Sequence, residues 1–383
     1  MLPRSAEVVV IGAGVTGASI AYYLGRRGLR NVVLLEQDAL GSGATSKAAG
    51  GIRQQFSSAV NIRLSQISLK VFEHFEEEFG ASPDFHQYGY LFLASTPEEA
   101  AELHQESELQ RSLGVPVRLV SPLEARAIVP PLYVGDILLG RFCPTDGVAG
   151  PYEVTQALAR RAAQQGAHVW EHTVVTAIDT AGGRIRSVTT DHGTIETPAV
   201  VNAAGAWGGQ IGKLAGVSLP VVPSRRHIFV THAFEAVPKG IPMTIEMAHG
   251  FYFRKEGLGV LMGMSAEDEP PGFNLEVDWN FLLRLAPVAA HRVPVLERAP
   301  IMRGWAGLYD VTPDAHPIVG PVPEVEGLYC AVGFSGHGFM HAPAVGQIMA
   351  ELITTGRCEL LDIAPLSLER FRGGALVSER AVI

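Results

Sequence analysis

The chain has 383 residues, of which 47% are hydrophobic and 18% are charged, and its formal net charge is −9. That length exceeds one ordinary hydrophobic core and predicts two domains, while the acidic balance and the lack of a basic block argue against a nucleic-acid or anionic-membrane partner. No apolar run reaches the roughly eighteen residues that a membrane span needs. The three cysteines, Cys143, Cys330 and Cys358, are too widely spaced for a metal motif or a disulfide framework, so we expect a reducing, cytoplasmic location.

A dinucleotide-binding pattern lies near the N-terminus. The Val-rich run 7–11 predicts a buried parallel strand, too short for a signal peptide, and 15–27 predicts a helix. Between them, Gly12 permits a tight turn, Gly14 lets the backbone approach a pyrophosphate, and Gly17 lets the helix pack closely on the strand. The phosphates would then meet free N–H groups at the start of the helix, around Val15 and Thr16.

The second predicted strand ends at an acid in the expected place. Residues 31–35 form this strand and Glu36 follows it, 24 residues after Gly12, where a carboxylate accepts hydrogen bonds from the ribose hydroxyls of a dinucleotide. A lone GxGxxG would be a weak signal. The complete strand, loop, helix, strand and acid predict a dinucleotide site, against the alternative of a merely tight βα turn.

The next segment, residues 41–51, is rich in small and hydroxyl-bearing residues and carries one cation. This composition is typical of a phosphate cradle. A flexible linker is the alternative, which is less favoured because the segment runs directly into Arg53-Gln54-Gln55-Phe56. The expected cofactor-contacting residues here are Gly43, Ala44, Thr45, Ser46, Lys47, Gly50 and Gly51.

The chain then predicts two insertions into the nucleotide-binding domain. Apolar residues recur at helical spacing from Val60 to Phe79, after a cap at Ser57 or Ser58. In the first insertion we expect a strand over 88–94, a helix over 97–113 and short Pro-punctuated elements over 116–140. In the second we expect strands over 226–231, 250–255, 258–264 and 301–309 and a helix over 277–290, forming an antiparallel sheet that carries the substrate.

The remaining elements complete the nucleotide-binding domain. A buried strand at 199–207 breaks at small residues, which is a common ligand-binding edge. A glycine turn, residues 333–338, follows the strand 328–332 and precedes a helix over 343–354. The other expected elements are a helix over 151–165 and strands over 168–170, 174–178, 184–190 and 194–196.

Several motifs together resemble the FAD-dependent D-amino-acid-oxidase superfamily. They are the N-terminal fingerprint, 203–207 (AAGAW), 305–309 (WAGLY), 312–314 (TPD) and 333–339 (GFSGHGF), and the likeness runs from end to end. The chain is most similar to the branch of sarcosine oxidases, the β subunits of sarcosine oxidase and L-proline dehydrogenase, and dimethylglycine dehydrogenase. The resemblance implies a flavoprotein that oxidises the C–N bond of a small amino acid. The further cofactor contacts expected are Val174, Ala204, Gly205, Trp207, Gly333, Ser335, Gly336, His337, Gly338, Phe339 and Met340.

The fold class follows from this organisation. We expect an α/β protein in which a Rossmann-type FAD-binding domain, residues 1–84, 145–219 and 310–383, is interleaved with an antiparallel-sheet substrate-binding domain, residues 85–144 and 220–309. The flavin is expected to be non-covalent, because Gly307 and Lys47 stand where relatives carry a linking cysteine and a linking histidine.

The substrate residues are expected on both domains. The resemblance places a carboxylate-binding arginine at Arg53, and a guanidinium can hold a carboxylate through two parallel hydrogen bonds, although a structural ion pair is the alternative. Tyr252 resembles an active-site tyrosine, or is a packed sheet aromatic. Tyr309 stands where glycine oxidase and D-amino-acid oxidase have an arginine, and Met340 where the sarcosine branch has a lysine, which favours a proline-like substrate. His337 could touch flavin or substrate, or simply cap backbone groups.

These residues predict oxidation of a sarcosine- or proline-like amino acid to an imine, with a glycine or D-amino-acid oxidase activity as the alternative. A third possibility is a flavin-bearing subunit of a heteromeric complex that relays electrons to a partner. Oxygen, a quinone or a partner subunit could accept the electrons. Because Leu261 stands where an oxygen-activating lysine lies in monomeric sarcosine oxidase, a dehydrogenase is slightly favoured over an oxidase.

Overall fold

A parallel sheet forms the centre of the first half of the molecule. The computed structural model describes residues 2–266, 268–373 and 376–382. Its six-stranded sheet has the order β18-β19-β12-β1-β2-β8, and all neighbours are parallel except β18 and β19. The short apolar runs predicted all of these strands except β18, because the strands of a parallel sheet are buried on both faces. The strands are β1 (Val8–Ile11), β2 (Val32–Leu35), β8 (His168–Trp170), β12 (Val200–Asn202), β18 (Ile318–Pro321) and β19 (Leu328–Val332).

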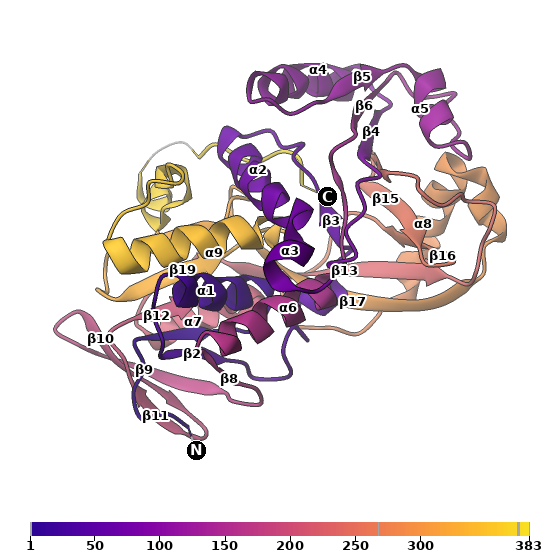
Figure 1. The fold of residues 1–383 in the computed structure, drawn as a ribbon. Coiled ribbons are helices and arrows are strands. Elements are labelled where there is room, and N and C mark those ends of the chain that lie inside the picture. The colour runs from indigo at the N-terminus through magenta and orange to yellow at the C-terminus, as the bar shows by residue number, and fades with distance from the viewer. Residues whose placement is uncertain (1, 267, 374–375, 383) are drawn as a thin grey trace.

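Helices cover one face of this sheet, and a small sheet contributes to the cover of the other. On the first face α1 (Val15–Arg26) packs between α6 (Pro151–Gln164) and α9 (Gly338–Thr355), and α2 (Ala59–Glu73) packs against α9 (Figure 1). Their apolar side chains form one large buried cluster. On the other face, a second cluster joins the sheet to α7 (Gly208–Leu214) and to an antiparallel sheet, β9 (Val175–Ala181), β10 (Arg184–Thr190) and β11 (Gly193–Glu196).

The second half of the molecule is built on a larger, mostly antiparallel sheet of order β17-β13-β16-β15-β14-β4-β6-β5, in which only β14 and β4 are parallel. Helices α4 (Pro97–Ser112), α5 (Pro122–Ile128) and α8 (Trp279–Arg292) belong to this half (Figure 1). Its strands are β4 (Tyr90–Ala94), β5 (Arg118–Val120), β6 (Leu139–Cys143), β13 (Val222–Thr231), β14 (Met243–Glu246), β15 (Phe251–Glu256), β16 (Gly259–Gly263) and β17 (Ile301–Val311).

The chain passes from the first half of the molecule into the second half and then returns. A two-stranded sheet pairs β3 (Gly51–Ile52) with β7 (Gly147–Val148), next to the point where the chain leaves and re-enters the first half. The expected α/β fold class is confirmed. No helix in the described part of the chain is long and apolar enough to cross a membrane.

Two predicted helices differ from those observed. The helix expected to run to Phe79 is interrupted at His74, so that α3 (Phe75–Phe79) is a separate short helix. The helix expected from Pro343 begins at Gly338 instead, and Pro343 lies in its first turns. Pro343 is therefore inside the helix, in its second turn, where it has no N–H to donate to the carbonyl oxygen of Phe339. The earlier start places the N-terminus of α9 directly after the glycine turn.

Candidate functional site

The glycine fingerprint forms the turn that was predicted from its spacing. Gly12 has φ of +101°, and a Cβ there would lie 2.5 Å from the carbonyl oxygen of Ala203. A Cβ on Gly17 would lie 1.9 Å from the carbonyl oxygen of Gly12. Only glycine allows α1 to approach β1 and β12 this closely. The first N–H groups of α1 therefore face the same edge of the sheet as the end of β12.

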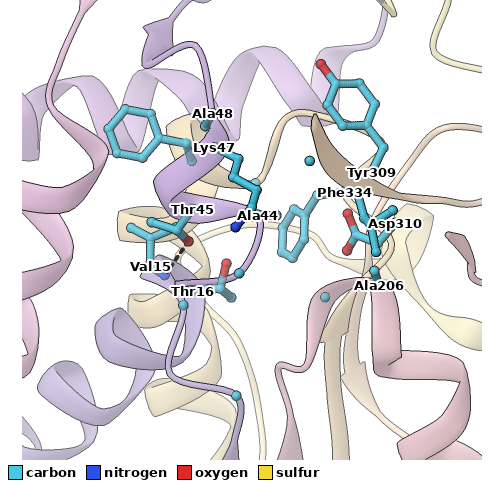
Figure 2. Close-up of a pocket in the computed structure, with 18 of the residues that line it drawn as sticks. Val15, Thr16, Ala44, Thr45, Lys47, Ala48, Ala206, Tyr309, Asp310 and Phe334 are labelled. Atoms are coloured by element: carbon cyan, nitrogen blue, oxygen red, sulfur yellow. Dashed lines mark hydrogen bonds between the residues drawn. The ribbon is translucent and has the colours of Figure 1, made fainter. Parts of the chain in front are cut away.

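Two side chains organise this edge. Glu36, at the end of β2, accepts a hydrogen bond from the N–H of Ala13 through Oε2 at 2.8 Å. Thr45 lies in the short 3₁₀ helix η1 (Thr45–Lys47), and its Oγ1 accepts from the N–H of Val15 at 3.1 Å (Figure 2). A carboxylate, a hydroxyl and a helix N-terminus thus meet where the ribose and pyrophosphate of a dinucleotide would bind.

A cavity of about 440 Å³ extends from this edge to the large sheet. Most of the expected cofactor residues line it. They are Gly12, Gly14, Val15, Thr16, Glu36, Gly43, Ala44, Thr45, Lys47, Gly50, Gly51, Val174, Ala204, Gly205, Trp207, Gly336, His337, Gly338, Phe339 and Met340. The four expected substrate residues, Arg53, Tyr252, Tyr309 and His337, line the same cavity.

Four of the expected cofactor residues, Gly17, Ser46, Gly333 and Ser335, are not among the lining residues. Gly17 provides the helix–strand contact described above. The Ser46 hydroxyl donates to the carbonyl oxygen of Ser42 at 2.9 Å, inside its own loop. The N–H of Gly333 donates to Asp310, and the Ser335 hydroxyl accepts from the N–H of Thr312 at 3.2 Å. These residues shape the loops around the cavity.

The two positions considered for flavin attachment lie side by side. A Cβ on Gly307 would be 3.0 Å from the Cβ of Lys47. The Lys47 ammonium donates to the carbonyl oxygen of Ser42 at 2.7 Å, and the Trp305 indole donates to the carbonyl oxygen of Lys47 at 3.0 Å. Sequence comparison proposed the two positions separately, and the structure places them at one wall of the cavity, where neither residue offers a thiol or an imidazole.

The glycine turn is fastened to β17 by Asp310. Its Oδ2 accepts from the N–H of Gly333 at 2.7 Å, and its carbonyl oxygen accepts from the N–H of Ser335 at 3.0 Å. Burial raises the pKa of the Asp310 carboxyl to about 6, while the surrounding N–H groups favour its charged form. The turn leads into α9, whose first N–H groups form a partial positive charge beside the cavity.

Asp310 should therefore make the folding stability depend on pH. Its ordinary pKa is 3.8 and its folded pKa is about 6, so between these values the folded protein binds the proton more tightly than the unfolded chain. This group's contribution is complete below about pH 4 and is lost as the pH rises through 6, by roughly 3 kcal/mol. Asp310→Asn removes the titration, so the free energy of unfolding of wild type, relative to this variant, should fall between pH 4 and 7. If denaturant unfolding showed the same change in the free energy of unfolding with pH for both proteins, the assignment would be contradicted.

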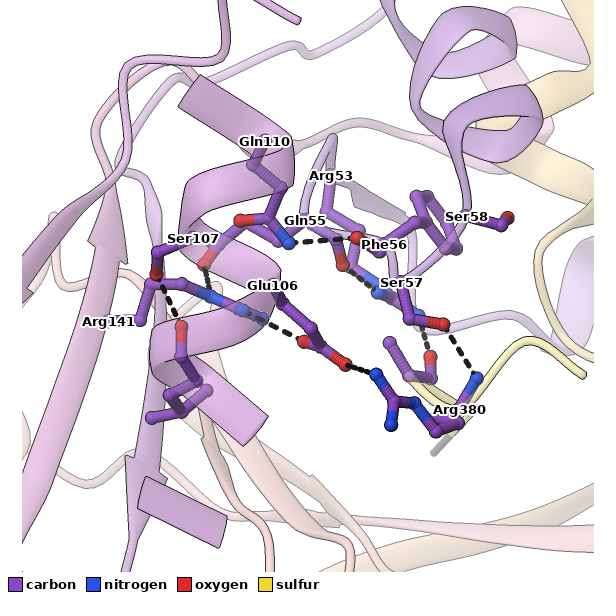
Figure 3. Close-up of polar contacts among 12 residues, drawn as sticks. Arg53, Gln55, Phe56, Ser57, Ser58, Glu106, Ser107, Gln110, Arg141 and Arg380 are labelled. Carbon is purple, nitrogen blue, oxygen red and sulfur yellow. Dashed lines mark hydrogen bonds and ion pairs between the residues drawn. The ribbon is translucent and has the colours of Figure 1, made fainter. Parts of the chain in front are cut away.

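Arg53 is almost fully buried, with 2% exposure, and makes no ion pair with a described carboxylate (Figure 3). Its Nη1 donates to the carbonyl oxygen of Gln55 at 2.5 Å, and its Nη2 donates to the Nε2 of His337 at 3.1 Å and to the carbonyl oxygen of Ala381. The guanidinium lies 4.1 Å from the centre of the Phe56 ring. The alternative of a structural ion pair is thus not observed among the described residues.

The loop that carries Arg53 is held by buried polar contacts. Asp146 is fully buried and accepts from the N–H of Gln54 at 2.9 Å and from the Gln55 amide at 3.0 Å. The other end of the Gln55 amide accepts from Arg141 Nε at 2.8 Å, and Arg141 pairs with Glu106 at 2.8 Å. The segment Arg-Gln-Gln-Phe, which looked unlike a linker in the sequence, is therefore a fixed loop.

The contact with Arg53 determines the protonation state of His337. A guanidinium can only donate, so His337 Nε2 must accept and the ring proton must be on Nδ1. Burial, followed by the charge of Arg53, holds the pKa of His337 well below its usual range. The ring is neutral, and its Nδ1 is buried without a hydrogen-bond partner. His337 thus orients the guanidinium and has no free lone pair to act as a base.

Three tyrosines, Tyr90, Tyr252 and Tyr309, gather at the substrate end of the cavity. Burial raises the pKa of all three phenols, so they remain protonated and can donate. Their hydroxyls make no hydrogen bond with another described residue, although Tyr252 is only 8% exposed. Each ring packs against a glycine, since a Cβ on Gly51, Gly263 or Gly336 would collide with Tyr90, Tyr252 or Tyr309, respectively.

Sequence reasoning missed Arg226, which also lines the cavity. It lies on β13 opposite Gly307 of β17, and its guanidinium carbon is 5.1 Å from the centre of the Tyr309 ring. Alternation along β13 could have indicated it, because Arg226 and Ile228 point to the same face. Leu261 of β16, in contrast, is 1% exposed in an apolar cluster with Val230 and is not a lining residue.

The fold and site define a flavin-dependent oxidoreductase, because the residues at the fingerprint, Glu36 and the glycine turn fit a dinucleotide whose reactive end faces the large sheet. A family model described as "DAO: FAD dependent oxidoreductase" matches residues 7–352. The chain belongs to this family. Among the described residues, no group of His, Cys, Asp or Glu side chains could hold a metal ion.

Two curated relatives illustrate the likeness in sequence. FAD-dependent oxidoreductase domain-containing protein 1 of Xenopus laevis is 35% identical, over 100% of this chain and 85% of the relative. Sarcosine dehydrogenase, mitochondrial, of Homo sapiens is 33% identical over 97% of this chain, which spans only 42% of that protein.

Two solved structures are similar across almost the entire chain. L-proline dehydrogenase from P. horikoshii has a TM-score of 0.92 and 37% identity, covering 97% of this chain and 99% of that one. Glycine oxidase from Geobacillus kaustophilus has a TM-score of 0.86 and 31% identity, covering 96% and 99%, respectively. The expected resemblance to this superfamily is confirmed.

Proposed function

We propose that this protein oxidises the C–N bond of a small secondary or N-methyl amino acid, sarcosine- or proline-like, to an imine. The observation that carries the proposal is the buried guanidinium of Arg53, which forms no ion pair with a carboxylate of the described residues. It lies at the end of a cavity whose other end is a dinucleotide site. Such a cation is costly to bury unless a ligand anion pairs with it. The neighbouring tyrosine hydroxyls offer hydrogen bonds to the same ligand.

In this proposal the chain's own residues position the substrate. Arg53 binds the carboxylate, held in orientation by His337 and by the carbonyl oxygens of Gln55 and Ala381. Met340, 6% exposed, and the tyrosine rings exclude water. Bound FAD supplies the two-electron acceptor for the hydride equivalent from the α C–H bond. The neutral secondary amine becomes an iminium ion as the hydride equivalent leaves, and water then hydrolyses it and takes up the released proton. In this proposal positioning by the chain's residues, rather than an acid–base pair, carries the step.

Anaerobic flavin bleaching by a panel of amino acids tests the function. We expect sarcosine or L-proline to bleach the flavin, and glycine and D-alanine, which are primary amines, to act at least about tenfold more slowly. D-Proline in the same panel tests which configuration is accepted. The reverse order would favour the glycine oxidase reading, which the structural likeness to glycine oxidase also supports. Absence of bleaching by any amine would contradict the proposal.

Because Lys47 and Gly307 form one wall of the cavity, we expect FAD to be bound without a covalent link to the protein. Neither residue can form a thioether or histidyl link, so we expect acid or heat denaturation to release all FAD into the supernatant. The measurement is the absorbance of the precipitated polypeptide and of the supernatant. Yellow colour that stays with the precipitate would contradict this prediction.

We also propose that the electron acceptor is a quinone, a dye-like carrier or a partner subunit rather than oxygen. The named sarcosine and L-proline dehydrogenases support a dehydrogenase, and β16 carries no ionisable side chain from Gly259 to Gly263. We expect substrate-reduced flavin to reoxidise in air-saturated buffer at least about tenfold more slowly than turnover with an artificial acceptor. Stopped-flow reoxidation as fast as turnover, with stoichiometric peroxide, would make the protein an oxidase.

A partner subunit and a cytoplasmic location remain proposals. Trp279 and Leu283 of α8 are 54% and 72% exposed, which is compatible with a protein contact on this helix. If the isolated chain binds FAD but no amine bleaches it, a flavin-bearing subunit of a larger complex would be the better reading.

A further inference from the structure

A second guanidinium that forms no ion pair with a described carboxylate, that of Arg226, lines the cavity. Arg226 donates through Nη1 to the Ser224 hydroxyl at 2.7 Å and to the carbonyl oxygen of Arg225 at 2.9 Å. Its Nε is buried with no hydrogen-bond partner, and no hydrogen bond of its Nη2 is found among the described residues. Nε–H and Nη2–H form the side edge of a guanidinium, which binds a carboxylate through two parallel hydrogen bonds. No described residue accepts a hydrogen bond from this edge.

Several other buried or half-buried arginines have acidic partners, whereas half-buried Arg161 donates to the backbone carbonyl oxygens of Phe79 and Glu78 instead. Arg225, the neighbour of Arg226 on β13, points to the opposite face of the sheet and pairs with Glu269 at 2.8 Å. The comparable pairs are Arg141–Glu106 at 2.8 Å, Arg292–Asp136 at 2.7 Å and Arg370–Asp314 at 2.7 Å. Arg53 and Arg226 thus differ from these arginines, and both line the cavity.

Arg53 and Arg226 line the same cavity, and the guanidinium carbon of Arg226 lies 5.1 Å from the centre of the Tyr309 ring. The charges of Glu379 and Asp146 act on Arg53, but neither acid forms an ion pair with it among the described residues. Both guanidiniums act electrostatically on the buried phenol of Tyr309, since the charge of each lowers the Tyr309 pKa against the effect of burial. Asp310, the adjacent acid on β17, is hydrogen-bonded to Gly333 and forms no ion pair with a described cation. One carboxylate on the substrate would neutralise only one of the two arginines.

We propose that the substrate carries two acidic groups, one on each side of the reacting amine, and that Arg53 binds one and Arg226 the other. The substrate class is a small secondary amine with two carboxylates. This inference deepens the proposed function and rests on it. Arg226 is then a specificity-determining residue, which selects a dianion over a monocarboxylate such as sarcosine.

Two ethers that cannot undergo amine oxidation test the inference in the FAD-loaded protein. Methoxyacetate copies sarcosine with one carboxylate, and diglycolate carries a second carboxylate on the other side of the same ether oxygen. Dissociation constants come from the change in flavin absorbance on titration, without turnover. We expect wild type to bind diglycolate at least about tenfold more tightly than methoxyacetate, as one charge-assisted contact predicts.

Arg226→Gln should raise the diglycolate dissociation constant at least about tenfold and leave that of methoxyacetate within about twofold. Arg226→Lys keeps the charge but loses the parallel hydrogen bonds, so the ratio of the methoxyacetate to the diglycolate dissociation constant should fall at least about threefold. If the glutamine variant does not retain flavin, the lysine variant provides the test. Arg303→Gln, at an exposed position of β17, is the matched control and should change neither constant.

Three results would overturn the inference. The first is that wild type binds both ethers equally or binds neither. The second is that Arg226→Gln weakens the binding of both ethers equally, which would make Arg226 the site of a single carboxylate. The third is that this variant weakens the binding of neither ether. The amine-bleaching panel is independent of this test. Selective, Arg226-dependent diglycolate binding without amine bleaching would refute the proposed oxidation and leave the two-anion site intact.

Discussion

Gly17→Ala is expected to lower the affinity for FAD by about 100-fold. The new Cβ would lie 1.9 Å from the carbonyl oxygen of Gly12, which belongs to the backbone and cannot turn aside. The start of α1 must move away from β1, and the N–H groups of Val15 and Thr16 move with it. Overpacking of this kind costs about 1–3 kcal/mol, and the upper end applies where backbone meets backbone.

The measurement is titration of the apoprotein with FAD, followed by quenching of flavin fluorescence, together with circular dichroism to record the fold. Gly272→Ala is the matched control, because a Cβ there meets no atom within 4 Å and its φ is not positive, and it should leave FAD binding unchanged. If Gly17→Ala binds FAD as wild type does, the close contact between helix and strand does not form the cofactor site.

Arg53→Lys is expected to lower kcat/KM for the amino-acid substrate on the order of 100-fold, mainly through KM, with normal flavin content. Lysine keeps a charge but cannot donate to Gln55, His337 and Ala381 while also holding a carboxylate. A charge-assisted hydrogen bond contributes about 1.5–3 kcal/mol, so the loss corresponds to roughly 10- to 150-fold.

Steady-state kinetics with an artificial acceptor, and substrate titration of the flavin under anaerobic conditions, measure this effect. Arg303→Lys provides an exposed control on β17. Because Arg53 also holds the loop that follows β3, the flavin content and thermal unfolding of each variant must match wild type before the kinetics are compared. An unchanged dissociation constant in a correctly loaded variant would show that Arg53 does not bind the substrate carboxylate.

The nucleotide end of the site could be predicted from the sequence because its determinants are local. Gly12, Gly17 and Glu36 act within one strand–helix–strand unit, in which the spacing along the chain determines the spacing in space. The limits of α9 could not be predicted in the same way. Its first turn, at Gly338, depends on the anchoring of the glycine turn by Asp310, which comes from another strand.

The substrate end was predicted only in part, because it is assembled from distant strands. Arg53 and Tyr252 were identified by resemblance, yet the contacts of Arg53 with His337 and Ala381 join residues that are 284 and 328 positions apart. Leu261 was aligned with the oxygen-activating lysine of monomeric sarcosine oxidase. In the structure it is buried in an apolar cluster and does not line the cavity. No sequence motif marks Arg226. It lines the cavity because of the register in which β13 pairs with β17.

The sequence by itself determined the α/β class and the dinucleotide fingerprint, which depend on periodicity and on neighbours within one supersecondary unit. The family followed from the resemblance of several motifs along the chain, and most of the residues predicted to contact the cofactor line the cavity. Only the tertiary structure decided that Arg53 has no described acidic partner, that Lys47 and Gly307 share one wall, and that Arg226 faces Tyr309. Charge compensation and close packing depend on which side chains are in contact across the two sheets. Pairing between strands that are distant in the sequence, such as β13 and β17, produces these contacts.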